Sequence, residues 1–347
     1  MECQDIYKYL NPNSNDIITT MNNSDRVNIM LSLRKYYLEL RESLNIDNHV
    51  TFGTEIEFED ANRSDIESEL ASIFPDGSWK VVDDGSLYQG GEINSPVLRD
   101  TEKTWLDLST VCNIVNKNAQ VLENTSAHVH IGMHILGNNP KYWRNFAFIW
   151  MTYENIITRF LYGEYVSPRE GLQKYATPIA RDLIDDFVML EKYSNSKTAI
   201  EILKKLNKTD EKRRSINFRH IGKTPLYNYG KEAEKNTIEF RGANGTFNPI
   251  IWQNNINLLV KILEYCKSDN FNDEIINRRL QTIEVNEIPS NIFKYGQTNI
   301  AQAIEFADLI FTNNLDKLYF LKQYIKDYKT SMVPLTKSEP FTKQLTL

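Results

Sequence analysis

Residues 50–59 read VTFGTEIEFE, and their apolar and polar side chains alternate with a period of two. This period predicts a β-strand with one apolar face and one face that carries Glu55, Glu57 and Glu59. Glu55 and Glu57 would point to the same side, roughly 7 Å apart along the strand, a spacing that suits two neighbouring cations. A solvated strand face is the alternative, but Gly53 weakens it because glycine lets a backbone or a ligand approach closely.

Further stretches predict strands, and helical periodicity fills the segments between them. The strands are expected in WKVVD (79–83) and LYQGGEINSPV (87–97), which form a hairpin around DDGS, and in SAHVHIGMHI (126–135), RRSINFRHI (213–221) and NTIEFRGAN (236–244). The helices are expected at 27–43, at 64–74 with Ser64 as the N-cap, at 101–118, at 140–210 with breaks at Pro168 and Pro178, and from 254 onward. Strands and helices do not alternate regularly, so we expect an α+β fold with a largely antiparallel sheet.

No linker clearly divides the chain. The expected parts are an accessory helical segment at 1–48, a main domain at 49–330 with a helical insertion or lid at about 140–210, and a polar tail at 331–347. The most apolar long stretch, 142–162, is interrupted by three charged residues, so it predicts a buried helix instead of a membrane span.

The composition narrows the class of protein. The 347 residues carry a net charge of -6, so no basic field attracts nucleic acid or an anionic membrane, and we expect neither as a partner. The N-terminal MECQDIYKYLNPNSND lacks the features of a signal peptide. Cys3, Cys112 and Cys266 are too scattered for a zinc knuckle or a disulfide framework and suit a reducing compartment. We therefore expect a cytoplasmic protein.

Two of the other strands carry candidate metal ligands. On the hairpin, Glu92 follows two glycines, which are costly in a strand unless something packs closely there. Asp84 is a weaker candidate because turns favour aspartate. On SAHVHIG, His128 and His130 share one face, and such a pair of imidazoles is hard to explain by core packing. Neutral imidazole is a common metal ligand, although His130 could instead donate to phosphate.

The last two strands add arginines. Glu239 and Arg241 share a face, which a plain ion pair would also explain, and Arg214 and Asn217 lie on the strand before. Oxygen ligands with few nitrogens and no thiolate favour Mg²⁺ or Mn²⁺. Arginines beside such cations indicate an anionic substrate, most simply the phosphates of a nucleotide. The GxxxxGK[ST] pattern of a P-loop is absent, so cations and arginines would hold the phosphates.

Four motifs in this order resemble the amidoligase family: FGTEIEFE, W-x-V-x-D-D-G-S-L with GGEINSP, SAHVHIG and TIEFRGANGT. That family belongs to the carboxylate–amine ligases with a glutamine-synthetase-like fold, and the similarity covers roughly residues 50–250. It implies a curved, largely antiparallel sheet with flanking helices that forms a funnel, with ATP at one end and the acceptor at the other. It also implies two or three divalent cations, Mg²⁺ or Mn²⁺.

The resemblance also implies roles for the candidate residues. The cation near the acceptor carboxylate would be bound by Glu57 and Glu92, with Asp84 as a further candidate ligand. The cation that bridges the ATP phosphates would be bound by Glu55, His128 and Glu239. His130 would contact phosphate, and Arg241 would stabilise the transferring phosphoryl group. Arg214 and Asn217, which match more loosely, would help to bind the nucleotide. We expect Arg241, Glu57 and His130 to be the catalytic residues.

The implied function is an ATP-dependent carboxylate–amine ligase. A substrate carboxylate attacks the γ-phosphate of ATP to form an acyl phosphate, and an amine then displaces phosphate. A remaining carboxylate such as Glu59 or Asp83 could deprotonate the amine. Two alternatives stay open: a metal-dependent hydrolase, in which the histidines and carboxylates activate water, and a non-catalytic binding protein that retains the fold.

Overall fold

The structure, a computed structural model, describes residues 10–33, 36–185, 213–221, 236–282 and 299–326. Its strands in this part of the chain are β1 (Phe52–Phe58), β2 (Lys80–Val82), β3 (Gly91–Asn94), β4 (Ser126–Gly132), β5 (Ile216–Asn217) and β6 (Thr237–Asn244). They form one sheet in the order β2-β3-β1-β4-β6-β5, and every neighbouring pair is antiparallel. The predicted α+β fold with a largely antiparallel sheet is confirmed.

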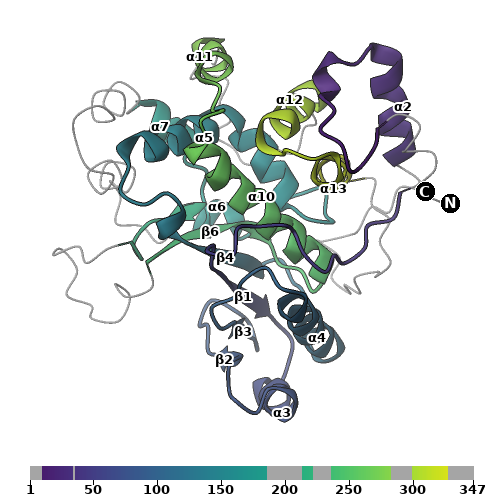
Figure 1. The fold of residues 1–347 in the computed structure, drawn as a ribbon. Coiled ribbons are helices and arrows are strands. Elements are labelled where there is room, and N and C mark those ends of the chain that lie inside the picture. Colours follow the sequence, from purple (N-terminus) through teal and green to yellow (C-terminus); the bar gives the residue numbers. More distant parts are fainter. Residues whose placement is uncertain (1–9, 34–35, 186–212, 222–235, 283–298, 327–347) are drawn as a thin grey trace.

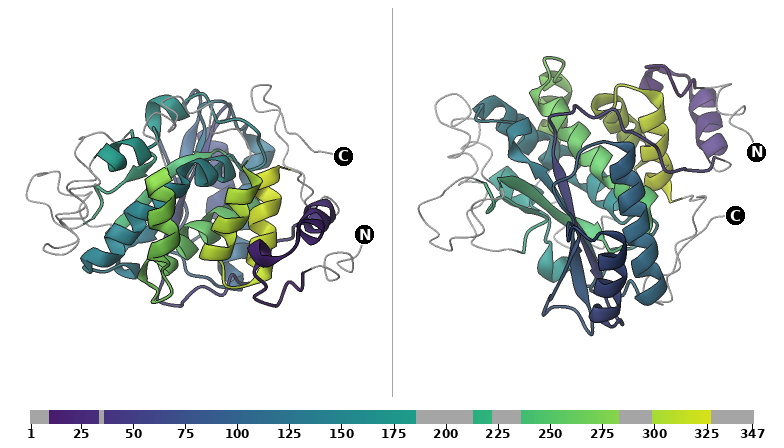
Figure 2. Two further views of the ribbon diagram at one scale, coloured as in Figure 1. Left: turned by 90° about the horizontal axis from the view of Figure 1, so that it is seen from above. Right: turned by 60° about the horizontal axis from the view of Figure 1, so that its bottom comes forward.

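Helices flank this sheet. The described ones are α2 (Asn23–Leu33), α3 (Arg63–Ile73), α4 (Glu102–Asn118), α5 (Pro140–Leu161), α6 (Leu172–Tyr175), α7 (Ala180–Asp185), α10 (Pro249–Lys267), α11 (Asp273–Thr282), α12 (Ile300–Ile310) and α13 (Asn314–Ile325), with short 3-10 turns η1 (Ile18–Thr20) and η2 (Met133–Ile135). Helices α5 and α10 contact β6 and β4, whereas α3 and α4 pack together at the β1–β3 end (Figures 1 and 2). No described helix is both long enough and apolar enough to cross a membrane.

An aromatic layer on α5 backs the apolar face of the sheet. Ile56, Val129 and Phe240 point to this face and are at most 2% exposed. The ring of Phe240 lies 6.3 Å from that of Phe146 and 5.7 Å from that of Trp150, measured between centroids. Burial of each such side chain contributes about 1.5–3 kcal/mol, so this layer holds the strands firmly from behind. The buried helix predicted at 142–162 is confirmed.

The helix predicted at 27–43 is wrong in its second half. Helix α2 ends at Leu33, and residues 36–41 run without helical structure beside α10 and α13. There Leu38 is buried against Tyr319, and the backbone N–H of Arg41 donates to Gln253 Oε1 at 2.9 Å. These long-range partners override the helical periodicity of the segment.

Two buried lysines of α13 hold the N-terminal segment in place. Lys317 and Lys322 are each 0% exposed. Lys317 Nζ donates to the carbonyl of Asp16 at 2.8 Å and to Asp308 Oδ1 at 2.9 Å, and Lys322 Nζ donates to the carbonyl of Leu33. A buried ammonium is costly unless it is hydrogen-bonded. Helix α13 and the N-terminal segment, which lie side by side in Figures 1 and 2, therefore depend on each other.

Two helix starts differ from the prediction because asparagines cap them. The α3 N-cap is Asn62, whose side chain accepts from the backbone N–H of Ser64 at 3.2 Å, so Ser64 is not the cap. Helix α10 starts before the predicted residue 254, because Asn248 caps it and Pro249 occupies the first turn.

Three predicted strands are much shorter in the structure. The one predicted at 87–97 is reduced to β3, which covers Gly91–Asn94. Strand β4 stops at Gly132, and the next three residues form η2 instead of continuing the ladder. In the stretch 213–221, strand β5 covers only Ile216 and Asn217. It ends there because Asn217 Oδ1 accepts from the backbone N–H of Arg219 and turns the chain. The predicted helical region beyond residue 185 up to 210 and the tail at 331–347 lie outside the described residues.

The close approach expected at the glycines before Glu92 is confirmed. A Cβ added to Gly90 would lie 2.0 Å from the carbonyl oxygen of Phe58, and one added to Gly91 would lie 2.7 Å from that of Val82. Both obstacles are backbone atoms, which cannot move without disturbing the sheet. The glycines thus let the hairpin pass directly over the end of β1, and this sets the position of Glu92.

We predict that Gly90→Ala lowers the free energy of unfolding by about 1–3 kcal/mol, the usual cost of overpacking. Gly85→Ala in the same hairpin is the matched control, because no atom lies within 4 Å of its added Cβ. The control should stay within about 0.5 kcal/mol of the parent. Urea denaturation of the three proteins measures the difference, and equal stability of the two variants would contradict the close approach at Gly90.

Candidate functional site

The sheet face opposite the aromatic layer is strongly acidic, and the strand register decides which groups meet there. Directly opposite pairs have Cβ atoms about 4.5–5.5 Å apart. The pairs on this face are Glu57 with Glu92, Glu55 with His128, and His130 with Glu239. Strands β3, β1, β4 and β6 thus bring six sequence-predicted side chains together.

Glu57, Asp84 and Glu92 form an all-oxygen group. One carboxylate oxygen from each lies within 4.8 Å of the others. Glu57 is 4% exposed, and its Oε2 accepts from the backbone N–H of Ser126 at 2.7 Å. Burial, together with the charges of Glu55, Glu57 and Asp84, raises the pKa of Glu92 to about 8. A set of three carboxylates that must retain a proton to coexist fits a hard divalent cation such as Mg²⁺ or Mn²⁺.

Glu55, His128 and Glu239 form a mixed group, again within 4.8 Å of one another. His128 Nδ1 lies 3.0 Å from Glu55 Oε2 and 3.9 Å from Glu239 Oε1. On the other side of the ring, Nε2 lies 2.7 Å from Ser126 Oγ. A hydroxyl there can accept the Nε2 proton and leave Nδ1 free to bind a cation.

The pKa of Glu55 reflects a balance between burial and its histidine partners. Burial on its own would raise that pKa, but hydrogen bonds from His128 and His130 hold it well below the ordinary value. His130 Nε2 lies 2.8 Å from Glu55 Oε1, and its Nδ1 lies 3.1 Å from Thr237 Oγ1. Glu55 is therefore ionised at neutral pH and ready to bind a cation.

A β-bulge presents Arg241 to this face. Val129 pairs with Phe240 and Ala127 with Ala243, so Arg241 and its neighbouring glycine lie opposite the single residue His128. Arg241 Nη1 donates to Glu239 Oε1. Burial disfavours its charge, but the carboxylate of Glu239 raises the pKa of Arg241 above the ordinary value. Its Nε has no hydrogen-bond partner among the described residues, which leaves a donor for an anion.

Asn217 and His220 complete the environment of Glu239. Asn217 Nδ2 donates to Glu239 Oε2 at 2.6 Å, and His220 Nε2 lies 3.0 Å from the same oxygen. Burial opposes the charge of Glu239, yet the bond from His220 and the charge of Arg241 hold its pKa far below the ordinary value. We did not predict His220, because a period of two places it on the face away from Asn217. The asparagine at the start of the turn was the signal that could have found it.

Arg169 is a second functional candidate that sequence reasoning missed. It is 2% exposed, and its guanidinium donates to the carbonyls of Asn124 at 3.2 Å and Arg241 at 3.4 Å. Among the described residues, its Nε has no hydrogen-bond partner and no carboxylate forms an ion pair with it. Burial lowers the pKa of Arg169 to about 10, so it remains charged at neutral pH, and the charge of Glu57 opposes this shift. The residue sits in a loop after Pro168, where no periodicity shows its direction.

Three other predicted residues do not belong to these groups. Arg214 forms an ion pair with Asp182 of α7 at 2.8 Å, and the structure does not bring it to the acidic face. Asp83 is 75% exposed at its side chain and pairs with Arg63. Glu59 is buried, accepts from the backbone N–H of Tyr88 at 2.7 Å, and has its pKa raised by burial.

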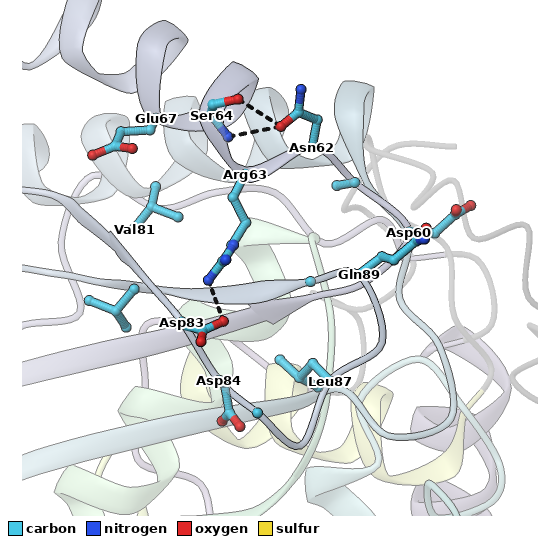
Figure 3. A pocket seen from close by; sticks show the side chains of 14 residues that line it. Asp60, Asn62, Arg63, Ser64, Glu67, Val81, Asp83, Asp84, Leu87 and Gln89 are labelled. Carbon is cyan, nitrogen blue, oxygen red and sulfur yellow. Dashed lines mark hydrogen bonds and ion pairs between the residues drawn. The ribbon is translucent and has the colours of Figure 1, made fainter.

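A cavity of about 890 Å³ adjoins the all-oxygen group. It lies between the hairpin loop at residues 83–90 and the start of α3, and Asp84 belongs to both the cavity wall and that group. Figure 3 shows Arg63 reaching from α3 to Asp83, while the carboxylate of Asp84 points away from this pair. The wall also carries Asp60 and Glu67, so its charge is predominantly negative.

The fold and this face can be compared with known proteins. A family model described as "Putative amidoligase enzyme" matches residues 48–263, well over half of the chain. The matched range contains all six strands and every residue of the groups above. Neither the curated proteins nor the solved structures include a match.

We predict that the metal-free protein loses stability as the pH rises from about 4.5 to about 8. The folded-state pKa of Glu92 is raised above its ordinary value of 4.5 to about 8, so the folded state binds more protons than the unfolded state across this window. Mg²⁺ or Mn²⁺ should restore stability, and most strongly above pH 8, where no proton competes.

Thermal denaturation across this pH range, with EDTA or with Mg²⁺, measures the effect. Glu92→Gln keeps the shape without the charge, so the fall with pH should be largely removed in that variant. If parent and variant show the same pH dependence, repulsion at Glu92 is not its source.

Proposed function

The chain belongs to the amidoligase family, and on that premise we propose that it is an ATP- and Mg²⁺-dependent carboxylate–amine ligase. It would join a substrate carboxylate to an amine through an acyl phosphate. The observation that carries this proposal is the placement of two cation-ready groups side by side on one buried sheet face, with one glutamate of β1 in each.

This placement suits a reaction between two anions. A carboxylate and the γ-phosphate of ATP repel each other, and two neighbouring divalent cations would neutralise both and hold them in line. The all-oxygen group faces the cavity at Asp84, which favours it for the acceptor carboxylate. The mixed group carries Glu239 with Arg241, which favours it for the nucleotide phosphates.

The proposed reaction has two steps, phosphoryl transfer and amide formation. The carboxylate oxygen forms a bond to the γ-phosphorus while the bond to the bridging oxygen of ADP breaks. Arg241, with its unused Nε donor, would stabilise the charge on the transferring group. An amine nitrogen then attacks the acyl carbon, and inorganic phosphate leaves. Arg169 adds a second fixed positive charge near Glu57 and Arg241, which supports an anionic intermediate there.

The amine must lose a proton in the second step. Glu59 is the candidate acceptor, because burial raises its pKa towards the range in which a carboxylate can take up a proton. The neighbouring Asp60 lines the cavity beside the all-oxygen group. The predominantly acidic wall there favours a positively charged amine substrate.

We predict ADP release above background when the protein meets Mg²⁺, ATP and pooled acids and amines. Glu57→Gln should lower the rate at least about 100-fold, because it removes one charge from the all-oxygen group. Glu274→Gln on α11 is the matched control, since that glutamate is exposed and far from the site, and it should keep the parental rate.

Two outcomes would overturn the proposal. One is an equal rate in Glu57→Gln and the parent, which would place the chemistry elsewhere. The other is hydrolysis of an amide or ester without ATP that requires Glu57, which would identify a metal-dependent hydrolase.

A further inference from the structure

We propose that His130, His220 and Glu239 form a further cation site, and that it takes a transition-metal ion such as Zn²⁺ or Co²⁺ in preference to Mg²⁺. We call these three residues the two-histidine group. Binding of the metal would need only the protein and would not depend on the ligase reaction proposed above.

The geometry fits one ion. A ligand atom from each of the three residues lies within 4.8 Å of the others. The centroids of the two imidazole rings are 5.6 Å apart, and His220 Nε2 lies 3.0 Å from Glu239 Oε2. The three side chains belong to residues that are 7%, 8% and 2% exposed, so an ion there would be largely shielded from water.

Glu239 can serve this group and the mixed group at once. Its Oε1 faces Arg241 and His128, whereas its Oε2 faces His220 and Asn217. A carboxylate offers about four lone-pair positions, two on each oxygen. Each oxygen can therefore keep its amide or guanidinium donor and still bind an ion, which makes Glu239 a bridge between two cations.

Neighbouring residues orient the ligands in the manner of a metal site. Thr237 Oγ1 lies 3.1 Å from His130 Nδ1, and a hydroxyl there can accept the Nδ1 proton when Nε2 turns to a metal. Asn217 Oδ1 is occupied by the backbone N–H of Arg219, so its Nδ2 must face Glu239. The same turn carries His220 back towards the sheet.

The donor types determine the preferred ion. Mg²⁺ prefers oxygen ligands, as in the all-oxygen group, whereas imidazole suits Zn²⁺, Fe²⁺, Ni²⁺ and Cu²⁺. Two imidazoles with one carboxylate are a set that holds transition metals with open positions for water or substrate. The competing explanation is a hydrogen-bonded network that orients Glu239 and binds no metal. Titration with a transition-metal ion distinguishes this network from a metal site.

The test is a Co²⁺ titration of the metal-free full-length protein in saturating Mg²⁺, without nucleotide, followed by visible absorption. We expect a tight class of Co²⁺ binding with the d–d bands of nitrogen ligation. His220→Ala should weaken it by at least about 10- to 100-fold, since loss of even an outer-shell partner costs that much. His134→Ala is the matched control, because that histidine bonds to the carbonyl of His49 and lies outside the group.

A second variant and a folding check show whether the loss of binding is specific to the two-histidine group. Glu92→Gln alters the all-oxygen group and leaves the two-histidine group intact, so it should retain the tight class. Thermal denaturation in EDTA checks that His220→Ala is folded. The proposal fails if the tight class is missing in the folded parent, if it persists in His220→Ala, or if it disappears in His134→Ala. Because no ATP is present, this result is independent of the ADP-release assay.

Discussion

Mutual repulsion among buried carboxylates is the constraint on which the rest of this structure depends. Four glutamates from strands β3, β1 and β6 lie on one face of the sheet, and the antiparallel register forces them together. Like charges in a buried site cannot all stay ionised without compensation. The protein compensates unevenly: imidazoles bond to Glu55, Arg241 neutralises Glu239, and Glu92 retains its proton to about pH 8. The all-oxygen group, which contains Glu92, has the weakest compensation and therefore gains most from a divalent cation.

Such repulsion requires a scaffold that does not relax. The aromatic layer of α5 packs against β6 from behind, and the glycines of the hairpin leave no space between it and β1. The bulge in β6 is built into the same rigid ladder, so Arg241 is directed at the face by backbone geometry. Positioning of this precision matters, because a displacement of about 1 Å at reacting groups can cost 100-fold in rate.

Period-two alternation was enough to predict most of the sheet and the residues of its acidic face. It works there because a strand has only two sides, and one of them must be apolar. It fails where the chain turns. His220 follows a turn that the side chain of Asn217 makes, and Arg169 lies in a loop after Pro168. Arg214 pairs with Asp182 of α7 instead of the glutamates of the acidic face. The helix predicted at 27–43 fails in its second half for a different reason, since the hydrogen-bond partners of that part belong to α10 and α13.

The buried lysines of α13 bear on what counts as a self-sufficient unit of this protein. The family similarity begins at residue 48 and ends at residue 263, yet Lys317 and Lys322 take their acceptors partly from residues 16 and 33. Cutting the chain at the edges of the similarity would separate these ammonium groups from their carbonyls and expose the outer sides of α5 and α10. One hydrophobic core runs from Leu10 to Tyr324, so the acidic face and the flanking segments are parts of one packed body, and the boundaries of sequence relatedness are not boundaries of folding.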